Sequence, residues 1–475
     1  MSHSDDFDYD PEAEQLAADL ESRDPIVRAK ALLASAQKLL HVNGTDSVAG
    51  IYLEEALTLF LAADEAEQVG ETAYHLGSFL SATKQHDRAV EVHLQGAEYA
   101  RRAMDDTNEL MNIQGIAWTY KRLKQHAKAA EYFSIAYDLA VAQNHWSLKF
   151  IAPDYARALR KTGNFERAAE LLKVSVEEGR ATGEDFPIVM GDQELAAVLI
   201  AQGKYEEALA AATEAFNIAV YVDQGREAER AQFYKARALN MLGRFNEAME
   251  ELMQIKVYKR YKSKNKHRLR VDFEIAKARA GLGEHASAAE LFKQIIPLFD
   301  AFNVRDTAVE AMFHSAMNYM AQGNDLDAEM LLAQCLDRVS DSRIPSLEID
   351  ASALLGAIYE SREQWDRVVS VYEPLVSNPT NQFSAWFPSV LQSLAVAYSA
   401  LGRLAEADAS AAQVLSSGVK LDPTLVVGDS LAVRASCAVE AGNTAAARRF
   451  GRQAIKSYLA GGFSSKAASL AELYL

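Results

Sequence analysis

A repeat of 39 or 40 residues runs through the chain and constrains its fold more than any other feature of the sequence. Eight units carry a glycine followed five residues later by an alanine, at Gly44/Ala49, Gly163/Ala168, Gly203/Ala208, Gly243/Ala248, Gly283/Ala288, Gly323/Ala328, Gly402/Ala407 and Gly442/Ala447. Three further units align with them, at Lys84/Ala89, Lys124/Ala129 and Glu363/Val368. A fixed period of this length is the signature of stacked repeats, so the sequence predicts a solenoid of about eleven units.

A small residue lies seven positions before the turn in every unit except the first. The residues at this position are Gln37, Gly77, Ala117, Ala156, Ala196, Ala236, Ala276, Ala316, Gly356, Ala395 and Ala435. Small side chains at a fixed position allow two helices to approach closely, and the alanine after the turn is the matching contact. Each unit is therefore predicted to be a helix A, a tight turn and an antiparallel helix B, where glycine supplies the positive φ that a helix end favours. The predicted fold class is all-α.

The fifth unit shows the repeat pattern most completely. Its residues are a leucine and a small residue in helix A, a glycine in the turn, an aromatic residue after it and two alanines in helix B: Leu195, Ala196, Gly203, Tyr205, Ala208 and Ala215. In these residues the chain resembles the tetratricopeptide-repeat superfamily, in a long form of about 40 residues where the common repeat has about 34. The resemblance implies a right-handed superhelical solenoid of helix-turn-helix repeats over residues 26–460. It also implies that helix A of each repeat lines the concave surface and helix B the convex one.

The two ends of the chain depart from the repeat. Up to Asp24 the N-terminal segment has nine acidic residues against one basic residue, Arg23, and it lacks the apolar stretch of a signal peptide. We expect residues 1–25 to form an acidic, disordered tail. Two roles stay open for it: a solubilising spacer, or a competitor that occupies a basic groove. Residues 461–475 are predicted to form a capping helix.

Composition narrows the classes of partner. The net charge of −17 argues against nucleic acid as the main partner, because nucleic-acid binding requires a basic surface. No apolar run reaches the roughly 18 residues of a membrane-spanning helix, so we expect no membrane insertion. Only two cysteines, Cys335 and Cys437, occur in 475 residues, which indicates a reducing compartment and a cytoplasmic protein.

Motifs for catalysis or metal binding are missing from the sequence. There is no G-x-S-x-G, no phosphate-binding loop and no H-E-x-x-H. His86 and His93 lie seven residues apart on one predicted helix, but packing explains them better than a metal site does. We therefore expect no enzymatic activity, no cofactor and no metal.

The groove-facing positions of helix A, which lie about 2, 3, 6, 9, 10 and 13 residues before each turn, give the candidate binding site. In repeats 3 to 7 these positions are rich in basic and aromatic residues: Trp118, Lys121, Arg122, Arg157, Arg160, Lys161, Gln193, Arg230, Phe233, Tyr234, Arg237, Asn240, Arg270, Phe273 and Lys277. Asp154, Glu194 and Glu274 are the acidic members, and a basic run, Lys256–Arg270, adjoins the set. Arginine binds carboxylates and phosphates bidentately, and aromatic rings offer flat contacts, so an anionic ligand fits this set. The alternative is a solvated charged face.

Together these features favour a protein- or peptide-binding scaffold, an adaptor or chaperone-like protein whose partner carries an acidic segment. The alternative is a peptide-sensing regulator, in which a peptide in the groove changes the activity of a partner. The sequence leaves the identity of the partner and the oligomeric state open.

Overall fold

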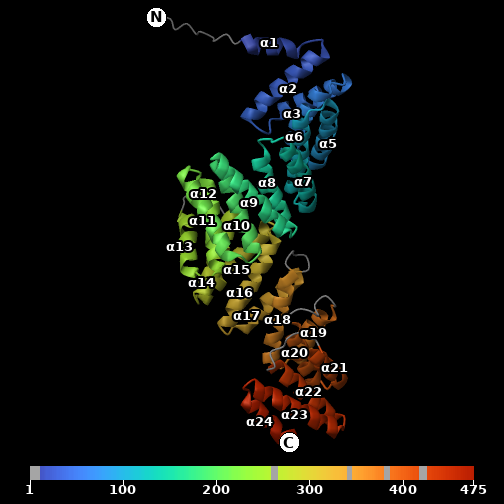
Figure 1. The fold of residues 1–475 in the computed structure, drawn as a ribbon, viewed down its shortest axis with the longest axis vertical. Coiled ribbons are helices and arrows are strands. Elements are labelled where there is room, and N and C mark those ends of the chain that lie inside the picture. Colours follow the sequence, from blue (N-terminus) through green and yellow to red (C-terminus); the bar gives the residue numbers. More distant parts are fainter. Residues whose placement is uncertain (1–10, 258–265, 340–344, 379–385, 417–424, 475) are drawn as a thin grey trace. The chain divides into compact units, whose positions relative to one another are not determined.

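A computed structural model of the chain describes residues 11–257, 266–339, 345–378, 386–416 and 425–474. Within these residues it contains 24 helices and no strand, which confirms the predicted all-α fold (Figure 1). The chain divides into two compact units, residues 1–255 and 256–475. None of the helices in the described ranges is long and apolar enough to cross a membrane.

The first unit consists of a leading helix and six helix pairs. Its helices are α1 (Pro11–Leu20), α2 (Pro25–Val42), α3 (Ser47–Ala62), α4 (Ala66–Ala82), α5 (His86–Ala103), α6 (Asp106–Arg122), α7 (His126–Ala142), α8 (Leu148–Lys161), α9 (Phe165–Thr182), α10 (Asp185–Ala201), α11 (Tyr205–Tyr221), α12 (Gly225–Met241) and α13 (Phe245–Val257). From α1 to α12, each helix packs against the next one in the chain. From α2 onward the even-numbered helices are the A helices of the repeats and the odd-numbered helices are the B helices.

The second unit continues the same pattern through five helix pairs and a final helix. Its helices are α14 (Lys266–Gly281), α15 (His285–Ala301), α16 (Arg305–Ala321), α17 (Asp325–Val339), α18 (Pro345–Ser361), α19 (Trp365–Ser377), α20 (Phe387–Ala400), α21 (Leu404–Ser416), α22 (Leu425–Glu440), α23 (Thr444–Ala460) and α24 (Ser464–Tyr474). The final helix α24 packs against α23, and Ala467 is buried in that contact.

Within each unit the hydrophobic core passes from one repeat into the next. In the first unit one cluster extends from Ala97 to Ala238, and Phe133 and Leu172 are fully buried in it. A second cluster extends from Val309 to Cys437. A single helix pair has too little apolar surface to bury alone, so each repeat depends on its neighbours for its core.

The repeat turns adopt the left-handed backbone that the glycines predict. Gly203 has a φ of +76°, and the N–H of Lys204 donates to the carbonyl of Leu199 at 2.9 Å, which closes the end of α10. Lys84 and Lys124 stand where other units have glycine, and both also have positive φ. The turn geometry therefore persists where its preferred residue is missing.

The first repeat departs from this geometry. Gly44 does not have positive φ, because α2 already ends at Asn43 in an extended conformation. The left-handed turn predicted at Gly44 is therefore wrong.

The N-terminal segment is partly ordered. Pro11–Leu20 forms the helix α1, which packs against α2, where the sequence predicts a disordered tail. Asp24 accepts hydrogen bonds from the backbone N–H groups of Ile26 and Val27 and so caps α2. Residues 1–10 lie outside the described residues, as do residues 258–265 of the predicted basic run.

Candidate functional site

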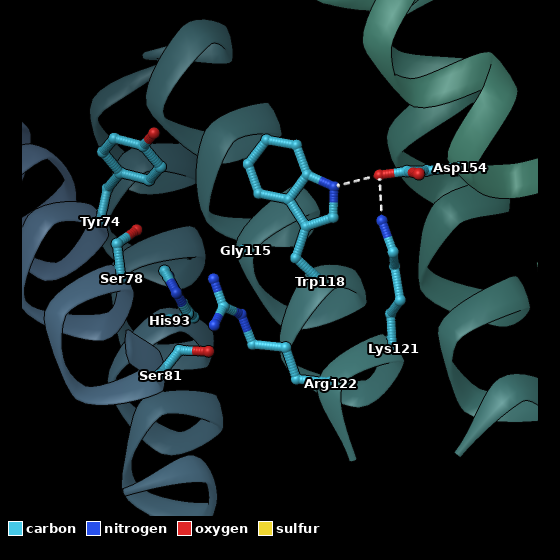
Figure 2. A pocket seen from close by; sticks show the side chains of 9 residues that line it. All are labelled: Tyr74, Ser78, Ser81, His93, Gly115, Trp118, Lys121, Arg122 and Asp154. Atoms are coloured by element: carbon cyan, nitrogen blue, oxygen red, sulfur yellow. Dashed lines mark hydrogen bonds and ion pairs between the residues drawn. The ribbon is translucent and has the colours of Figure 1, made fainter. Parts of the chain in front are cut away.

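Helices of repeats 2 to 4 line an open pocket of about 560 Å³ (Figure 2). Helices α4, α5, α6 and α8 contribute its lining, which is Tyr74, Ser78, Ser81, His93, Gly115, Trp118, Lys121, Arg122 and Asp154. A cavity of this size is typical of ligand-binding sites in proteins. The structure thus brings together three of the predicted binding residues, Trp118, Lys121 and Arg122.

His93 is the most deeply buried side chain of this lining and is 1% exposed. Its ring lies between Gly77 of α4 and Gly115 of α6. A Cβ atom at Gly77 would lie 2.6 Å from the ring Cε1, and one at Gly115 would lie 2.3 Å from it. Any larger residue at either position would collide with the imidazole, so the small residue at the helix contact here makes room for a histidine.

Burial lowers the pKa of His93 to about 4, although its contact with Asn112 acts in the opposite direction. The Nδ1 atom lies 3.1 Å from Oδ1 of Asn112. The imidazole is therefore neutral at pH 7 and can act as a hydrogen-bond acceptor.

The rim of the pocket carries one paired and one unpaired cation. Asp154 accepts at Oδ2 from the indole Nε1 of Trp118 at 2.9 Å and from Nζ of Lys121 at 2.6 Å. Arg122 is exposed and has no hydrogen bond or ion pair with any described residue. Figure 2 shows its side chain extending toward His93 and Ser81. Arg122 is therefore the cation at this pocket that is available to an anion.

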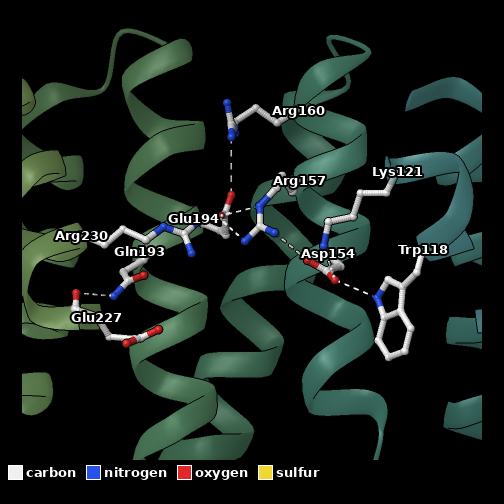
Figure 3. Close-up of polar contacts among 9 residues, drawn as sticks. All are labelled: Trp118, Lys121, Asp154, Arg157, Arg160, Gln193, Glu194, Glu227 and Arg230. Atoms are coloured by element: carbon white, nitrogen blue, oxygen red, sulfur yellow. Dashed lines mark hydrogen bonds and ion pairs between the residues drawn. The ribbon is translucent and has the colours of Figure 1, made fainter. Parts of the chain in front are cut away.

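A chain of ion pairs crosses the A helices next to the pocket, and we call it the charge ladder: Asp154, Arg157, Arg160, Glu194 and Arg230 (Figure 3). Arg157 donates to Oδ1 of Asp154 at 2.7 Å and, from Nε and an Nη atom, to Oε1 of Glu194 at 2.9 and 2.6 Å. Arg230 also donates to Glu194, and Arg160 lies 3.5 Å from Oε2 of Glu194. Three arginines from two helices thus converge on one carboxylate.

Glu194 is fully buried and charged. Burial acts to raise the pKa of Glu194, but Arg157, Arg230 and Arg160 outweigh it and hold the value at about 2. Burial acts to lower the pKa of Arg157, but Glu194 and Asp154 raise it above its ordinary range. The positive charges of the predicted residues Arg157, Arg160 and Arg230 are therefore largely neutralised by Glu194, inside the protein.

The remaining predicted residues of the first unit differ in how deeply they are buried. Gln193 is buried and donates to the carbonyl of Glu227 at 2.8 Å, while Phe233 and Asn240 are also buried. Tyr234 and Arg237 are half-buried and Lys161 is exposed.

Three predicted residues belong to the second unit. There Phe273 is buried against Phe292, Lys277 lies 3.8 Å from Glu274, and Arg270 is exposed. In the part of the chain that the structure describes, no group of three or more His, Cys, Asp or Glu side chains is arranged to hold a metal ion.

Comparison with known proteins identifies the repeat. The family model described as tetratricopeptide repeat matches residues 310–342. The apo form of the quorum sensor NprR from B. thuringiensis has a TM-score of 0.53 with this chain, at 13% identity over 69% of this chain and 92% of that one. Residues 310–342 thus match a tetratricopeptide repeat, and the chain shares the helical-repeat fold of the quorum sensor.

Two further solved structures resemble this chain with lower TM-scores. Aspartyl phosphate phosphatase F from Bacillus subtilis has a TM-score of 0.48 and 14% identity over 68% of this chain and 86% of that one. The kinesin light chain-like repeats from Podosopora anserina have a TM-score of 0.33 and 24% identity over 39% of this chain and 93% of that one. No curated protein matches the sequence.

The pocket includes residues outside the predicted binding set. Tyr74, Ser78 and Ser81 lie 10, 6 and 3 residues before the turn residue Lys84, which are groove-facing offsets in repeat 2. The same rule would have found them one repeat earlier. His93 stands on helix B, where the rule does not apply, so only its contact with the two glycines reveals it.

Proposed function

We propose that this chain is a cytoplasmic binding scaffold that holds an acidic segment of a partner protein or peptide. The docking surface is the pocket of repeats 2 to 4 with the adjoining A-helix surface of α8. The observation that carries this proposal is Arg122, a cation without a partner among the described residues, at the rim of a pocket with aromatic walls. An arginine beside flat aromatic rings is typical of binding hot spots.

In this proposal the charge ladder makes the surface beside the pocket rigid, and it contributes few direct contacts to the ligand. Its arginines are fixed by Asp154 and Glu194, so they contribute a preorganised wall beside the pocket. A preformed surface reduces the entropy lost when a flexible peptide binds. A partner with acidic residues would pair with Arg122 first and would gain less from the ladder.

A peptide-display selection against the purified chain tests this function. We expect selected peptides to be rich in Asp, Glu and aromatic residues, and their binding to be lost with Arg122→Glu. The matched control is Arg167→Glu, which reverses an exposed charge on helix B of repeat 4, and we expect it to leave binding unchanged. Selection of peptides with no acidic preference, or equal binding by both variants, would contradict the proposal.

A further inference from the structure

A cluster of aromatic rings stands at the edge of repeats 3 to 5, where the B helices lead into the A helices. We call it the edge cluster, and its members are His145, Trp146, Phe150 and Phe186. The ring centroids of Trp146 and Phe150 lie 5.8 Å apart in an edge-to-face arrangement, and those of Phe150 and Phe186 lie 5.2 Å apart. The connection from α7 to α8, the start of α8 and the start of α10 thus contribute to one surface.

Trp146 is the most exposed ring of the edge cluster. It is 62% exposed, whereas the other three tryptophans of the chain are half-buried. The turn that carries it is fixed, because the backbone N–H of the buried Ser147 donates to Nδ1 of His145 at 3.2 Å. Tryptophan is enriched at binding hot spots, so an indole that an ordered turn holds in solvent indicates a contact surface.

Acidic side chains border the edge cluster. Glu184 and Asp185 stand at the start of α10, directly before Phe186. Asp185 is exposed and has no hydrogen bond or ion pair with any described residue. Burial lowers the pKa of His145, which is therefore neutral at pH 7 and does not offset these carboxylates. The rings and the carboxylates together favour a cation as the ligand.

Lys149 shows how such a cation is held. Its Nζ atom lies 5.8 Å from the ring centroid of Phe150 and donates to Oε2 of Glu184 at 2.9 Å. A cation against an aromatic face is attracted by the electrons of the ring, and a carboxylate beside it adds an ion pair. Trp146 and Asp185 offer the same two groups, and no cation of the described residues lies over the indole.

We propose that the edge cluster binds a basic segment of a protein partner, with an arginine guanidinium on the indole of Trp146 and a second basic side chain paired with Asp185. Arginine fits because its planar guanidinium stacks on aromatic rings. An apolar side chain between the two cations fits against Phe150, which is 36% exposed. None of these residues lines the pocket at Arg122, so the inference goes beyond the function proposed above.

The charge of the chain favours a basic protein segment over nucleic acid. Single-stranded nucleic acid also stacks on aromatic side chains, but the carboxylates of Glu184 and Asp185 repel its phosphates. The net charge of −17 adds a long-range attraction for basic segments.

A binding measurement with a synthetic peptide and the full chain tests the proposal. The probe is the fluorescently labelled peptide Arg-Leu-Arg-Leu-Arg-Leu, and Trp146→Ala should weaken its binding about fivefold, the factor of one cation–π contact. The matched control is Tyr221→Ala, which removes an 88% exposed ring outside the edge cluster and should leave the dissociation constant unchanged. No loss in Trp146→Ala, or an equal loss in both variants, would overturn the proposal.

A charge variant keeps the test decisive if Trp146→Ala does not fold. Asp185→Asn should weaken the arginine peptide about threefold, because it removes one exposed ion pair. Asp87→Asn makes the same change of net charge at an exposed aspartate in the first turn of α5 and should leave binding unchanged. Equal weakening by the two variants would assign the binding to net charge alone and contradict the proposal.

An oligonucleotide of ten thymidines probes the other class of ligand. We expect it not to bind the full chain. Binding to the parent chain that is lost in Trp146→Ala would assign the rings to base stacking and overturn the proposal. The function proposed above is tested with acidic peptides and Arg122, so either account can fail while the other stands.

Discussion

The pocket and the charge ladder occupy neighbouring parts of one surface but differ in how their polar groups are satisfied. Gly115, Asp154 and Glu194 stand at the same position of successive repeats, nine residues before the turn. At Asp154 and Glu194 a carboxylate neutralises the arginines around it. At Gly115 there is no side chain, which leaves a pocket, the unpaired Nε2 of His93 and an unpaired Arg122. One repeat position thus decides whether the surface is closed or open.

The comparison shows why the number of basic residues is a poor guide to a binding site. Arg157 and Arg230 are among the predicted ligand contacts, but each already has a buried partner. A cation that is paired inside the protein can bind a ligand only by giving up part of that interaction. The affinity for an anion should therefore depend on Arg122, and the stability of the repeats should depend on the ladder.

The largest effect expected from this comparison is on stability, at Glu194. Glu194→Gln leaves Arg157, Arg160 and Arg230 without their common counter-ion and should lower the free energy of unfolding by about 3–5 kcal/mol. Urea denaturation of the variant and the parent chain measures this difference. The matched control is Glu214→Gln, which breaks an exposed pair with Arg180 and should cost less than about 1 kcal/mol. Equal losses in the two variants would contradict a structural role for the ladder.

The next effect concerns the space around His93. Gly115→Ala would place a methyl group 2.3 Å from the imidazole, and we expect a loss of about 3 kcal/mol in stability because the ring has no room to move. Thermal unfolding with peptide binding on the same sample measures both consequences. The control is Gly225→Ala, whose added Cβ meets no atom within 4 Å, and it should be neutral or slightly stabilising. A stable Gly115→Ala variant with an unchanged pocket would refute the close contact.

A third effect is the pH dependence of stability. Burial lowers the pKa of His93 and of His314 to about 4, below the ordinary value of 6.5. The unfolded chain therefore binds these protons first, and stability is lost as the pH falls from 6.5 toward 4. Between pH 6.5 and pH 5 each histidine should cost about 2 kcal/mol. Glu194 does not add to this loss, because its contribution is lost only as the pH falls below its ordinary pKa of 4.5.

Asp192 acts in the opposite direction within this window and provides the control. Burial and the nearby Glu214 raise the pKa of Asp192 to about 7, so the folded chain gains stability as this group takes up a proton below pH 7. Asp192→Asn removes that gain. We expect the stability of Asp192→Asn, measured by urea denaturation, to fall more steeply between pH 6.5 and pH 5 than that of the parent chain. A shallower fall in the variant would contradict the assignment.

Much of the fold follows from the sequence because the repeat depends on local geometry. A left-handed turn favours glycine, and a close contact between helices requires a small residue. Gly203 in the turn and the buried Ala196 at the helix contact could therefore be recognised from the sequence. The prediction failed at Gly44, where α2 ends before the glycine, and over Pro11–Leu20, which is helical.

The site was predictable only in part. The groove-facing offsets identified Trp118, Lys121 and Arg122, and they would have identified Tyr74 if applied to repeat 2. They did not show that Arg157 and Glu194, on separate helices, form a buried ion pair, because that depends on how side chains from successive repeats meet. The place of His93 in the pocket could not be predicted either. It depends on the contact of the imidazole with Asn112 on another helix, and the spacing of residues in the sequence does not reveal that contact.

The most direct test of the difference between pocket and ladder compares Arg122→Gln with Arg230→Gln in the same two assays. With an acidic peptide from the display selection, Arg122→Gln should weaken binding about tenfold and leave the unfolding temperature unchanged. Arg230→Gln should lower the unfolding temperature, because it uncovers Glu194, and change the dissociation constant less than about twofold. The reverse outcome, with affinity lost at Arg230 and stability lost at Arg122, would contradict the account.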